Sequence, residues 1–183
     1  MALETLRRVR GLVLLGLAIA LIIAGAYLIV PIPGSPVPVV LQNLFVVAAG
    51  MLLGPVRGGL AVAIYLLMGA VGLPVFSGGG GGLGHLAGPT GGYLVGFPAA
   101  ALAAGTICRG TPRPSRDVLG AVVGMLMVYL VGVPRLKAVL DISWGAALTV
   151  GFFPFLIGDA LKAAAAVGAV RLARRALPEI EVS

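Results

Sequence analysis

Long stretches of this sequence are almost free of charge, and this feature limits the possible folds more than any other. The residues from Gly11 to Val30, for example, include no Asp, Glu, Lys or Arg. A helix that crosses a lipid bilayer needs about 20 apolar residues. Only 10% of the residues are charged and the mean hydropathy is +1.12, whereas soluble domains carry about 25% charged residues. The chain is therefore predicted to lie in a membrane.

Prolines, glycines and charges divide the apolar sequence into six predicted membrane-spanning helices. Their approximate bounds are 11–30, 39–53, 56–72, 91–108, 117–133 and 152–173. The segment from Pro31 to Pro38 cannot be helical, because proline lacks a backbone donor and biases the preceding residue toward extended geometry. The more polar connection from Pro134 to Gly151 has room for a short interfacial helix. We expect an all-α integral membrane protein, with residues 1–183 forming a single six-helix membrane domain.

The basic residues are distributed unevenly between the two predicted sides of the membrane. Two of them, Arg135 and Lys137, lie on the side opposite the N terminus, and Lys162 lies within the last span. The other ten lie on the side of the N terminus: Arg7, Arg8, Arg10, Arg57, Arg109, Arg113, Arg116, Arg171, Arg174 and Arg175. Because cytoplasmic loops of membrane proteins are enriched in Lys and Arg, both termini are predicted to be cytoplasmic. The proline-rich and glycine-rich loops would then face outward.

Asp159 and Lys162 are charged residues inside the last predicted span. Their spacing of three places them on one face of a helix. A charge near the bilayer centre costs roughly 2.5–3.5 kcal/mol on insertion scales, so such residues usually have a function. Together they could bind a small urea or amide, because the carboxylate accepts from N–H groups and the ammonium donates to a carbonyl. The alternative is a structural ion pair.

Two further polar residues, Gln42 and Asn43, lie near the outer end of the second predicted span, at about the depth of Asp159. Both side chains can donate and accept hydrogen bonds. They are candidates for ligand binding. Hydrogen bonding between helices, often worth about 1 kcal/mol or less in membranes, is an equally good explanation.

The stretch from Gly78 to Gly92 contains nine glycines in fifteen positions. Glycine tolerates positive φ, lets the backbone approach a ligand and leaves backbone amides free for an anion. Turn residues from Gly88 to Tyr93 lead into the next helix. This ordered exit favours a loop that opens and closes, rather than a flexible external linker. His85, the only histidine, is interpreted as a polar residue of this external loop.

Several functional classes are disfavoured by the residues available. Nucleic-acid binding does not fit, because the basic residues lie at span ends without interleaved aromatic residues. One cysteine, Cys108, and one histidine provide no metal cluster. A membrane serine protease would need a serine on a helix facing the histidine, but the serines ahead of the C-terminal tail lie in predicted loops or at span boundaries. The sequence contains no GxxxxGK nucleotide-binding motif. We expect no enzyme activity, no metal and no bound cofactor.

Four motifs, in this order and spacing, resemble the BioY family of biotin-binding S components of energy-coupling factor (ECF) transporters. They are VPVVLQN, GLPVFSGG, GPTGGY and FPFLIGDALK, and the resemblance covers about residues 11–175. It implies a six-helix protein of the cell membrane that captures biotin with high affinity for an ATP-driven vitamin importer. Its implied partners are a transmembrane coupling subunit and a pair of ATPases.

The resemblance also implies roles for particular residues. Asp159 and Lys162 match the family's acid and lysine that bind the ureido head. The loops at 31–38 and 77–92 match the segments that enclose the ligand, and Ala20 and Ala24 match the small residues that meet the coupling subunit. The substrate-binding residues expected are Asp159, Lys162, Gln42, Asn43, Gly79, Gly80, Thr90 and Tyr93.

This sequence departs from the family pattern at two places. Gly78 to Gly82 is all glycine, where members can carry a polar side chain, and Val40 replaces the threonine of a frequent T-L-Q form. Backbone groups or water must take the place of a polar side chain there. Two other functions stay open, an S component for another vitamin and, less favoured, a membrane enzyme that uses Asp159 or His85. The alanines of the first span could also pack inside the bundle.

Overall fold

The structure is a computed structural model that describes residues 2–110 and 112–176. In these residues the long helices are α1 (Ala2–Tyr27), α2 (Gln42–Ala70), α4 (Gly91–Ile107), α5 (Pro114–Leu140) and α7 (Leu156–Ala176). Shorter elements connect them: β1 (Ile29–Val30), β2 (Val39–Val40), η1 (Ser77–Gly79), α3 (Leu83–Ala87), α6 (Trp144–Gly151) and η2 (Phe153–Phe155). Because α2 bends at Gly54, the long helices form six helical segments, as predicted.

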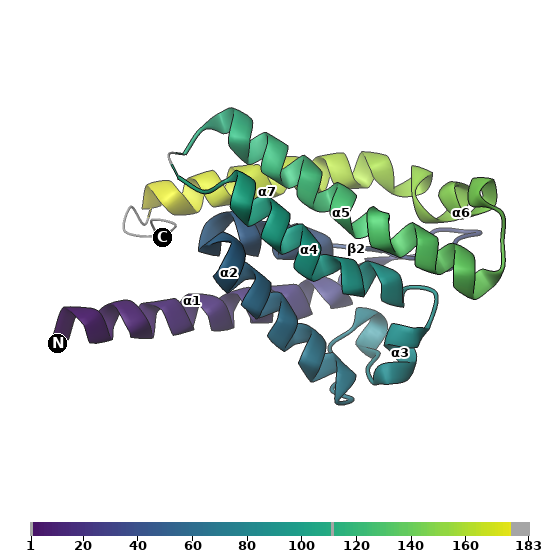
Figure 1. Ribbon diagram of the computed structural model, residues 1–183, viewed down its shortest axis with the longest axis horizontal. Helices are drawn as coiled ribbons and strands as arrows, with labels where there is room; N and C mark the ends of the chain where they lie inside the picture. The colour runs from purple at the N-terminus through teal and green to yellow at the C-terminus, as the bar shows by residue number, and fades with distance from the viewer. Residues whose placement is uncertain (1, 111, 177–183) are drawn as a thin grey trace.

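Four stretches of the described chain are long and apolar enough to cross a membrane, namely Glu4–Tyr27, Gln42–Ala70, Pro114–Leu140 and Trp144–Ala176. The apolar helix α4 is shorter. Figure 1 shows that the helical segments run roughly along one axis, with α3, α6 and the β1–β2 hairpin at one end of the bundle. The start of α1 and the end of α7 lie at the opposite end (Figure 1). The molecule therefore has a loop-rich end and an opposite end at which α1 begins and α7 ends.

The first three predicted helices differ from the observed ones mainly at their boundaries. Helix α1 ends at Tyr27 rather than residue 30, because Ile29 and Val30 pair with Val40 and Val39 in a short antiparallel hairpin. The predicted helices 39–53 and 56–72 are one bent helix that starts at Gln42 and stops at Ala70. It stops there because Gly72 has a φ of +101°, which is outside helical geometry.

The fifth helix was predicted too short, at 117–133, and the sixth, at 152–173, was predicted too early in the chain. Helix α5 starts at Pro114, since the first turn needs no donor there, and it continues through Pro134 to Leu140. The prediction that this helix ends at Val133 was wrong, because an interior proline removes one hydrogen bond without always ending a helix. The expected short helix in the connection is α6, and α7 begins at Leu156 rather than residue 152, after the 3₁₀ turn η2.

Small residues let α4 pack closely between α2 and α5. A Cβ added at Gly50 of α2 would lie 2.2 Å from the carbonyl oxygen of Ala101 in α4. One added at Gly96 of α4 would lie 3.1 Å from the Cα of Val128 in α5. In a membrane, helices associate through such close backbone approach, because lipid tails remove the hydrophobic driving force.

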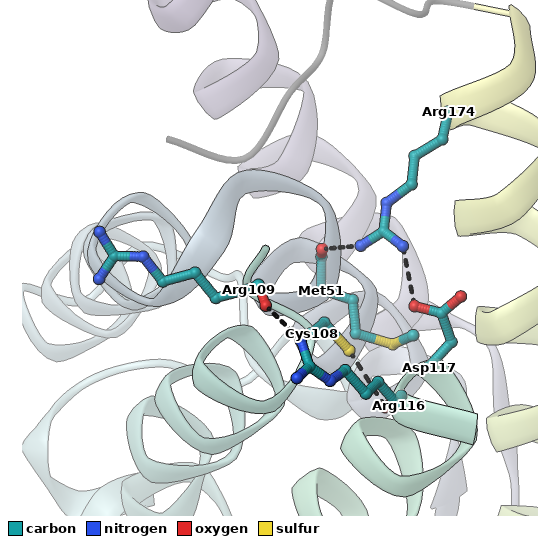
Figure 2. Close-up of polar contacts among 6 residues, drawn as sticks. All are labelled: Met51, Cys108, Arg109, Arg116, Asp117 and Arg174. Atoms are coloured by element: carbon teal, nitrogen blue, oxygen red, sulfur yellow. Dashed lines mark hydrogen bonds and ion pairs between the residues drawn. The ribbon is translucent and has the colours of Figure 1, made fainter. Parts of the chain in front are cut away.

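The bend in α2 is stabilised by the last helix. Gly54 has φ 80° and ψ 172°, and Pro55 has no N–H to donate to the carbonyl of Met51, four residues earlier. Figure 2 shows that Arg174 of α7 supplies the missing donor: its Nη2 lies 2.7 Å from the oxygen of Met51, and its Nη1 lies 2.8 Å from Oδ1 of Asp117 in α5. One guanidinium therefore joins α2, α5 and α7.

Candidate functional site

A buried polar cluster joins three helices around the carboxylate of Asp159. Lys162 donates to Oδ1 of Asp159 at 2.9 Å within α7, and Nδ2 of Asn43 in α2 donates to the same oxygen at 3.1 Å. Asp159 and Lys162 are each only 6% exposed. A buried ion pair needs additional hydrogen bonds to offset the loss of water, and Asn43 provides one of them. The structure thus brings together three of the residues predicted for the site.

The other oxygen of Asp159 is held by a residue that the sequence analysis did not include. The hydroxyl of Tyr129 in α5 donates to Oδ2 of Asp159. The ring of Tyr129 packs edge-on against Tyr93, 6.0 Å between centroids, and against Phe152, 4.8 Å away. The predicted residue Tyr93 therefore supports the cluster through Tyr129, and its own hydroxyl donates to the carbonyl of Gly151 at 2.8 Å.

Hydrogen-bonding capacity remains unused in this cluster. Oδ1 of Asn43 is buried and has no partner among the described residues. The Lys162 ammonium has three N–H donors, and its hydrogen bond within the described residues is the one to Asp159. A buried acceptor without a partner costs about 1–3 kcal/mol. The cluster is therefore suited to a ligand that donates to Asn43 and accepts from Lys162.

Gln42 lies beside Asn43 but does not join this cluster. Its Nε2 donates to the hydroxyl of Tyr65, which lies beyond the bend of α2. The Tyr65 ring packs edge-on against Phe76, 5.6 Å away, and Phe76 lies 5.2 Å from the ring of His85. Gln42 is thus connected to the glycine-rich loop by a row of aromatic rings.

The glycine-rich loop is folded against the bundle. Phe76 donates to the oxygen of Gly80 at 2.9 Å, and Gly82 donates to the oxygen of Gly69 at 2.7 Å. Gly79 has a φ of +75°, and a Cβ on Gly80 would lie 2.4 Å from Nδ1 of His85. Burial lowers the pKa of His85, because it disfavours the charged imidazolium.

Gly79 and Gly80 lie in a compact turn of this loop and make their backbone hydrogen bonds within it. Gly79 donates to the oxygen of Phe76 at 3.0 Å, and Gly80 donates to the oxygen of Ser77 at 3.4 Å. Thr90 caps the start of α4 through its backbone oxygen, which accepts from Tyr93 at 3.1 Å. Gly79, Gly80 and Thr90 therefore lie in the loop or at its exit, outside the hydrogen bonds around Asp159.

The proline-rich loop is tied to the same end of the molecule. The hydroxyl of Ser35 lies 2.6 Å from the carbonyl oxygen of Val150 in α6 and 3.0 Å from that of Val37. The hydroxyl of Tyr27, at the end of α1, donates to the oxygen of Pro74 ahead of the glycine-rich loop. Both loops are therefore attached at the end of the bundle where Asp159 lies, in the first turn of α7 (Figure 1).

Ala20 and Ala24 belong to a different surface of the molecule. They are exposed on α1, whereas Ile22, Gly25 and Ala26 of the same helix are buried. Of the four long apolar stretches, α1 is the least buried. The two alanines therefore lie on the outer face of the bundle.

A metal site is not formed by the described residues. Among them, no group of three or more His, Cys, Asp and Glu side chains could hold a metal ion. The charged cluster around Asp159 is thus built from one carboxylate, one ammonium, an amide and a hydroxyl.

Sequence reasoning missed Tyr129 and the contact between Asp117 and Arg174. Tyr129 carries a hydroxyl inside a predicted span, and that is the signal that could have identified it. Asp117 and Arg174 lie at the ends of spans, where charges are ordinary, so nothing in the sequence pairs them. The fold and the site together define a multi-pass membrane protein with a polar site buried between its helices, as in proteins that carry small solutes.

The particular family follows from comparison with known proteins. The chain belongs to the BioY family, whose profile matches residues 2–179. A probable biotin transporter BioY of Pyrococcus horikoshii is 42% identical over 154 residues, which are 84% of this chain and 90% of that protein. The biotin transporter BioY of Thermotoga maritima is 41% identical over 165 residues, covering 89% and 95%.

A solved structure gives the same result for the fold. The crystal structure of the S-component for biotin from an ECF-type ABC transporter superposes with a TM-score of 0.86 at 30% sequence identity. The match covers 92% of this chain and 93% of that one. The protein is thus a multi-pass integral membrane protein of a transporter family.

Proposed function

We propose that this protein is the biotin-capture subunit of an ECF-type vitamin importer, with the ureido ring of biotin bound at Asp159 and Lys162. The observation that carries this proposal is the unused hydrogen-bonding capacity beside the ion pair: the orphaned Oδ1 of Asn43 and the free donors of Lys162. A cyclic urea has two N–H donors flanking one carbonyl. Its N–H groups match the acceptors on Asn43 and Asp159, and its carbonyl matches the ammonium.

The glycine-rich loop is proposed to close over the other end of biotin, which carries a carboxylate. Gly81 is exposed, and its backbone N–H has no acceptor among the described residues. Backbone amides in a glycine turn attract an anion without a basic side chain. Gly79, Gly80 and Thr90 would contribute to the ligand site as parts of this lid, and Gln42 would support it through Tyr65 and Phe76.

Both termini are proposed to be cytoplasmic, with the two loops on the outer side. The ten-to-two distribution of basic residues supports this orientation. The start of α1 and the end of α7 lie at the same end of the bundle, as an even number of spans requires (Figure 1). Biotin would then reach its site from the outside, and the glycine-rich loop would close over it.

The partners are proposed to be a transmembrane coupling subunit and two ATPases, since the sequence has no GxxxxGK motif of its own. Ala20 and Ala24 are the proposed contact with the coupling subunit. They are exposed and lie four residues apart on one face of α1, where small side chains permit close helix approach.

The test is calorimetry on the purified protein with biotin and, separately, with other vitamins. Wild type should bind biotin most tightly, and Asp159→Asn should weaken binding roughly tenfold to more than hundredfold. This estimate follows because a hydrogen bond to a charged group contributes about 1.5–3 kcal/mol. Lys162→Ala should also weaken it. Asp141→Asn is the matched control, because Asp141 is exposed and its left-handed backbone tolerates asparagine.

The possible failures have different meanings. A preference for another vitamin would contradict the proposed ligand. Wild-type affinity in both Asp159→Asn and Lys162→Ala would leave biotin as the ligand and show that its ureido ring binds elsewhere.

A further inference from the structure

A cavity lies at the end of the bundle opposite the lid, between α5 and α7. Its volume is about 260 Å³, and it is lined by Pro112, Pro114, Asp117, Arg171, Arg174 and Arg175. Three of these residues are arginines and one is an acid, so the cavity has an excess of positive charge. None of the proposed biotin contacts lies in this cavity.

The three arginines lie on one face of the last turns of α7, because their positions are three and four residues apart. Arg174 is fixed by Asp117 and by the carbonyl of Met51 (Figure 2), and its Nε is buried without a partner. Arg171 and Arg175 have no ion-pair partner among the described residues. Like charges four residues apart destabilise a helix, so an anion between them would be stabilising.

A second element of the cavity also favours an anion. Helix α5 begins at Pro114, in the cavity wall, and its first intrahelical donor is Asp117, which bonds to the oxygen of Arg113 at 3.0 Å. The preceding N–H groups, those of Ser115 and Arg116, therefore point out of the helix start. Unpaired N–H groups and the helix dipole make such an end attractive to phosphate. The carboxylate of Asp117 opposes an anion, but Arg174 neutralises it.

The surroundings of the cavity indicate where the anion comes from. Leu172 beside the arginines, and Val118 and Leu119 beside Asp117, are 69%, 52% and 54% exposed. In a membrane protein these side chains face acyl chains, so the cavity opens where lipid headgroups lie. Arginine also matches phosphate geometry through two parallel N–H donors. We propose that this cavity binds the phosphate of an anionic lipid headgroup, held by Arg171 and Arg175.

The experiment uses the purified full chain in detergent, with native mass spectrometry to measure lipid affinity and thermal unfolding to measure stability. Phosphatidylglycerol should bind and raise the melting temperature more than phosphatidylcholine. Arg171→Gln combined with Arg175→Gln should weaken phosphatidylglycerol binding about thirtyfold, since each basic residue near an anionic membrane surface contributes about 1 kcal/mol. Biotin binding by this variant should be unchanged, which shows that it is folded.

The matched control is Arg57→Gln combined with Arg109→Gln, which removes two exposed charges from the same end outside the cavity. This control should keep its affinity for phosphatidylglycerol. An equal loss in both double variants would overturn the site, because only total charge would then matter. Equal stabilisation by inorganic phosphate alone would overturn the lipid as the source of the anion.

If the glutamine pair does not fold, Arg171→Lys with Arg175→Lys keeps the charge and removes the paired donors. It should bind phosphatidylglycerol several-fold more weakly than wild type. Wild-type affinity in the lysine pair would contradict phosphate recognition by the guanidinium groups.

Discussion

Asp159 has one partner on its own helix and two on other helices, and this explains how a charge is kept in a fixed position inside the membrane. Lys162 neutralises it, whereas Asn43 and Tyr129 orient its two oxygens from α2 and α5. A carboxylate held in this way needs no rearrangement when a ligand arrives. Such preorganisation raises affinity by lowering the entropic cost of binding.

The first prediction concerns Tyr129. Tyr129→Phe removes the hydroxyl that holds Oδ2 of Asp159, and biotin affinity should fall roughly tenfold to a hundredfold, as expected for a hydrogen bond to a charged group. Tyr93→Phe is the matched control, because its hydroxyl bonds to the neutral carbonyl of Gly151 and should contribute about 0.5–1.5 kcal/mol. Calorimetry measures both. Equal losses would show that the Tyr129 hydroxyl contributes no more than a hydrogen bond to a neutral group, and wild-type affinity in Tyr129→Phe would show that Tyr129 acts through packing alone.

At the scale of elements, the glycine-rich loop combines close contacts with unusual backbone geometry. A Cβ on Gly91 would lie 1.8 Å from the oxygen of Leu86, and one on Gly81 would lie 2.4 Å from that of Leu73. Gly78, Gly79 and Gly82 have positive φ. In this conformation the loop therefore accepts few side chains at these positions.

The second prediction follows from these contacts. Gly91→Ala and Gly79→Ala should slow biotin capture or speed its release, the first because of the Leu86 carbonyl and the second because of its positive φ. Gly84→Ala is the control, since nothing lies within 4 Å of its added Cβ. Association and dissociation of radiolabelled biotin give the rates. Wild-type rates in both test variants would favour a flexible linker over a lid.

The third prediction concerns α1. Ala20→Trp or Ala24→Trp should leave biotin binding by the purified protein intact while abolishing co-purification with a coupling subunit and uptake by cells. Ile22→Trp provides the contrast, because Ile22 is 0% exposed and a larger side chain there should disturb the fold itself. Uptake that survives both alanine substitutions would place the docking surface elsewhere.

The sequence predicted the presence of the helices better than the residues at which they begin and end. It also predicted the charged residues of the polar cluster better than the residues that bind them. Asp159 and Lys162 stand out because a charge in an apolar run is expensive. Tyr129 does not, because an aromatic residue in a span is ordinary and its partner lies 30 residues away. The helix through Pro134 was mispredicted because a local pattern does not show whether one missing hydrogen bond is tolerated. The way neighbouring helices are aligned depends on close contacts at glycines, and the periodicity of apolar residues along one helix does not predict these contacts.

At the scale of the whole molecule, the fourth prediction tests orientation in the membrane. Leu83→Cys, 72% exposed in α3, should react with a membrane-impermeant maleimide in intact cells. Ser115→Cys, exposed at the start of α5, should react only after permeabilisation. Wild type is the control, because its single cysteine, Cys108, is 2% exposed. The reverse pattern of labelling would place the termini outside.

The bend of α2 has a consequence for how the chain is made. The carbonyl of Met51 is satisfied by Arg174, 123 residues later, and Asn43 meets Asp159, 116 residues later. Both contacts use α7, which leaves the ribosome long after α2. A nascent chain that has inserted everything up to α6 therefore still has an open bend and an incomplete polar site. Insertion of α7 completes both at once, so the polar site can bind a ligand only after this helix has joined the bundle.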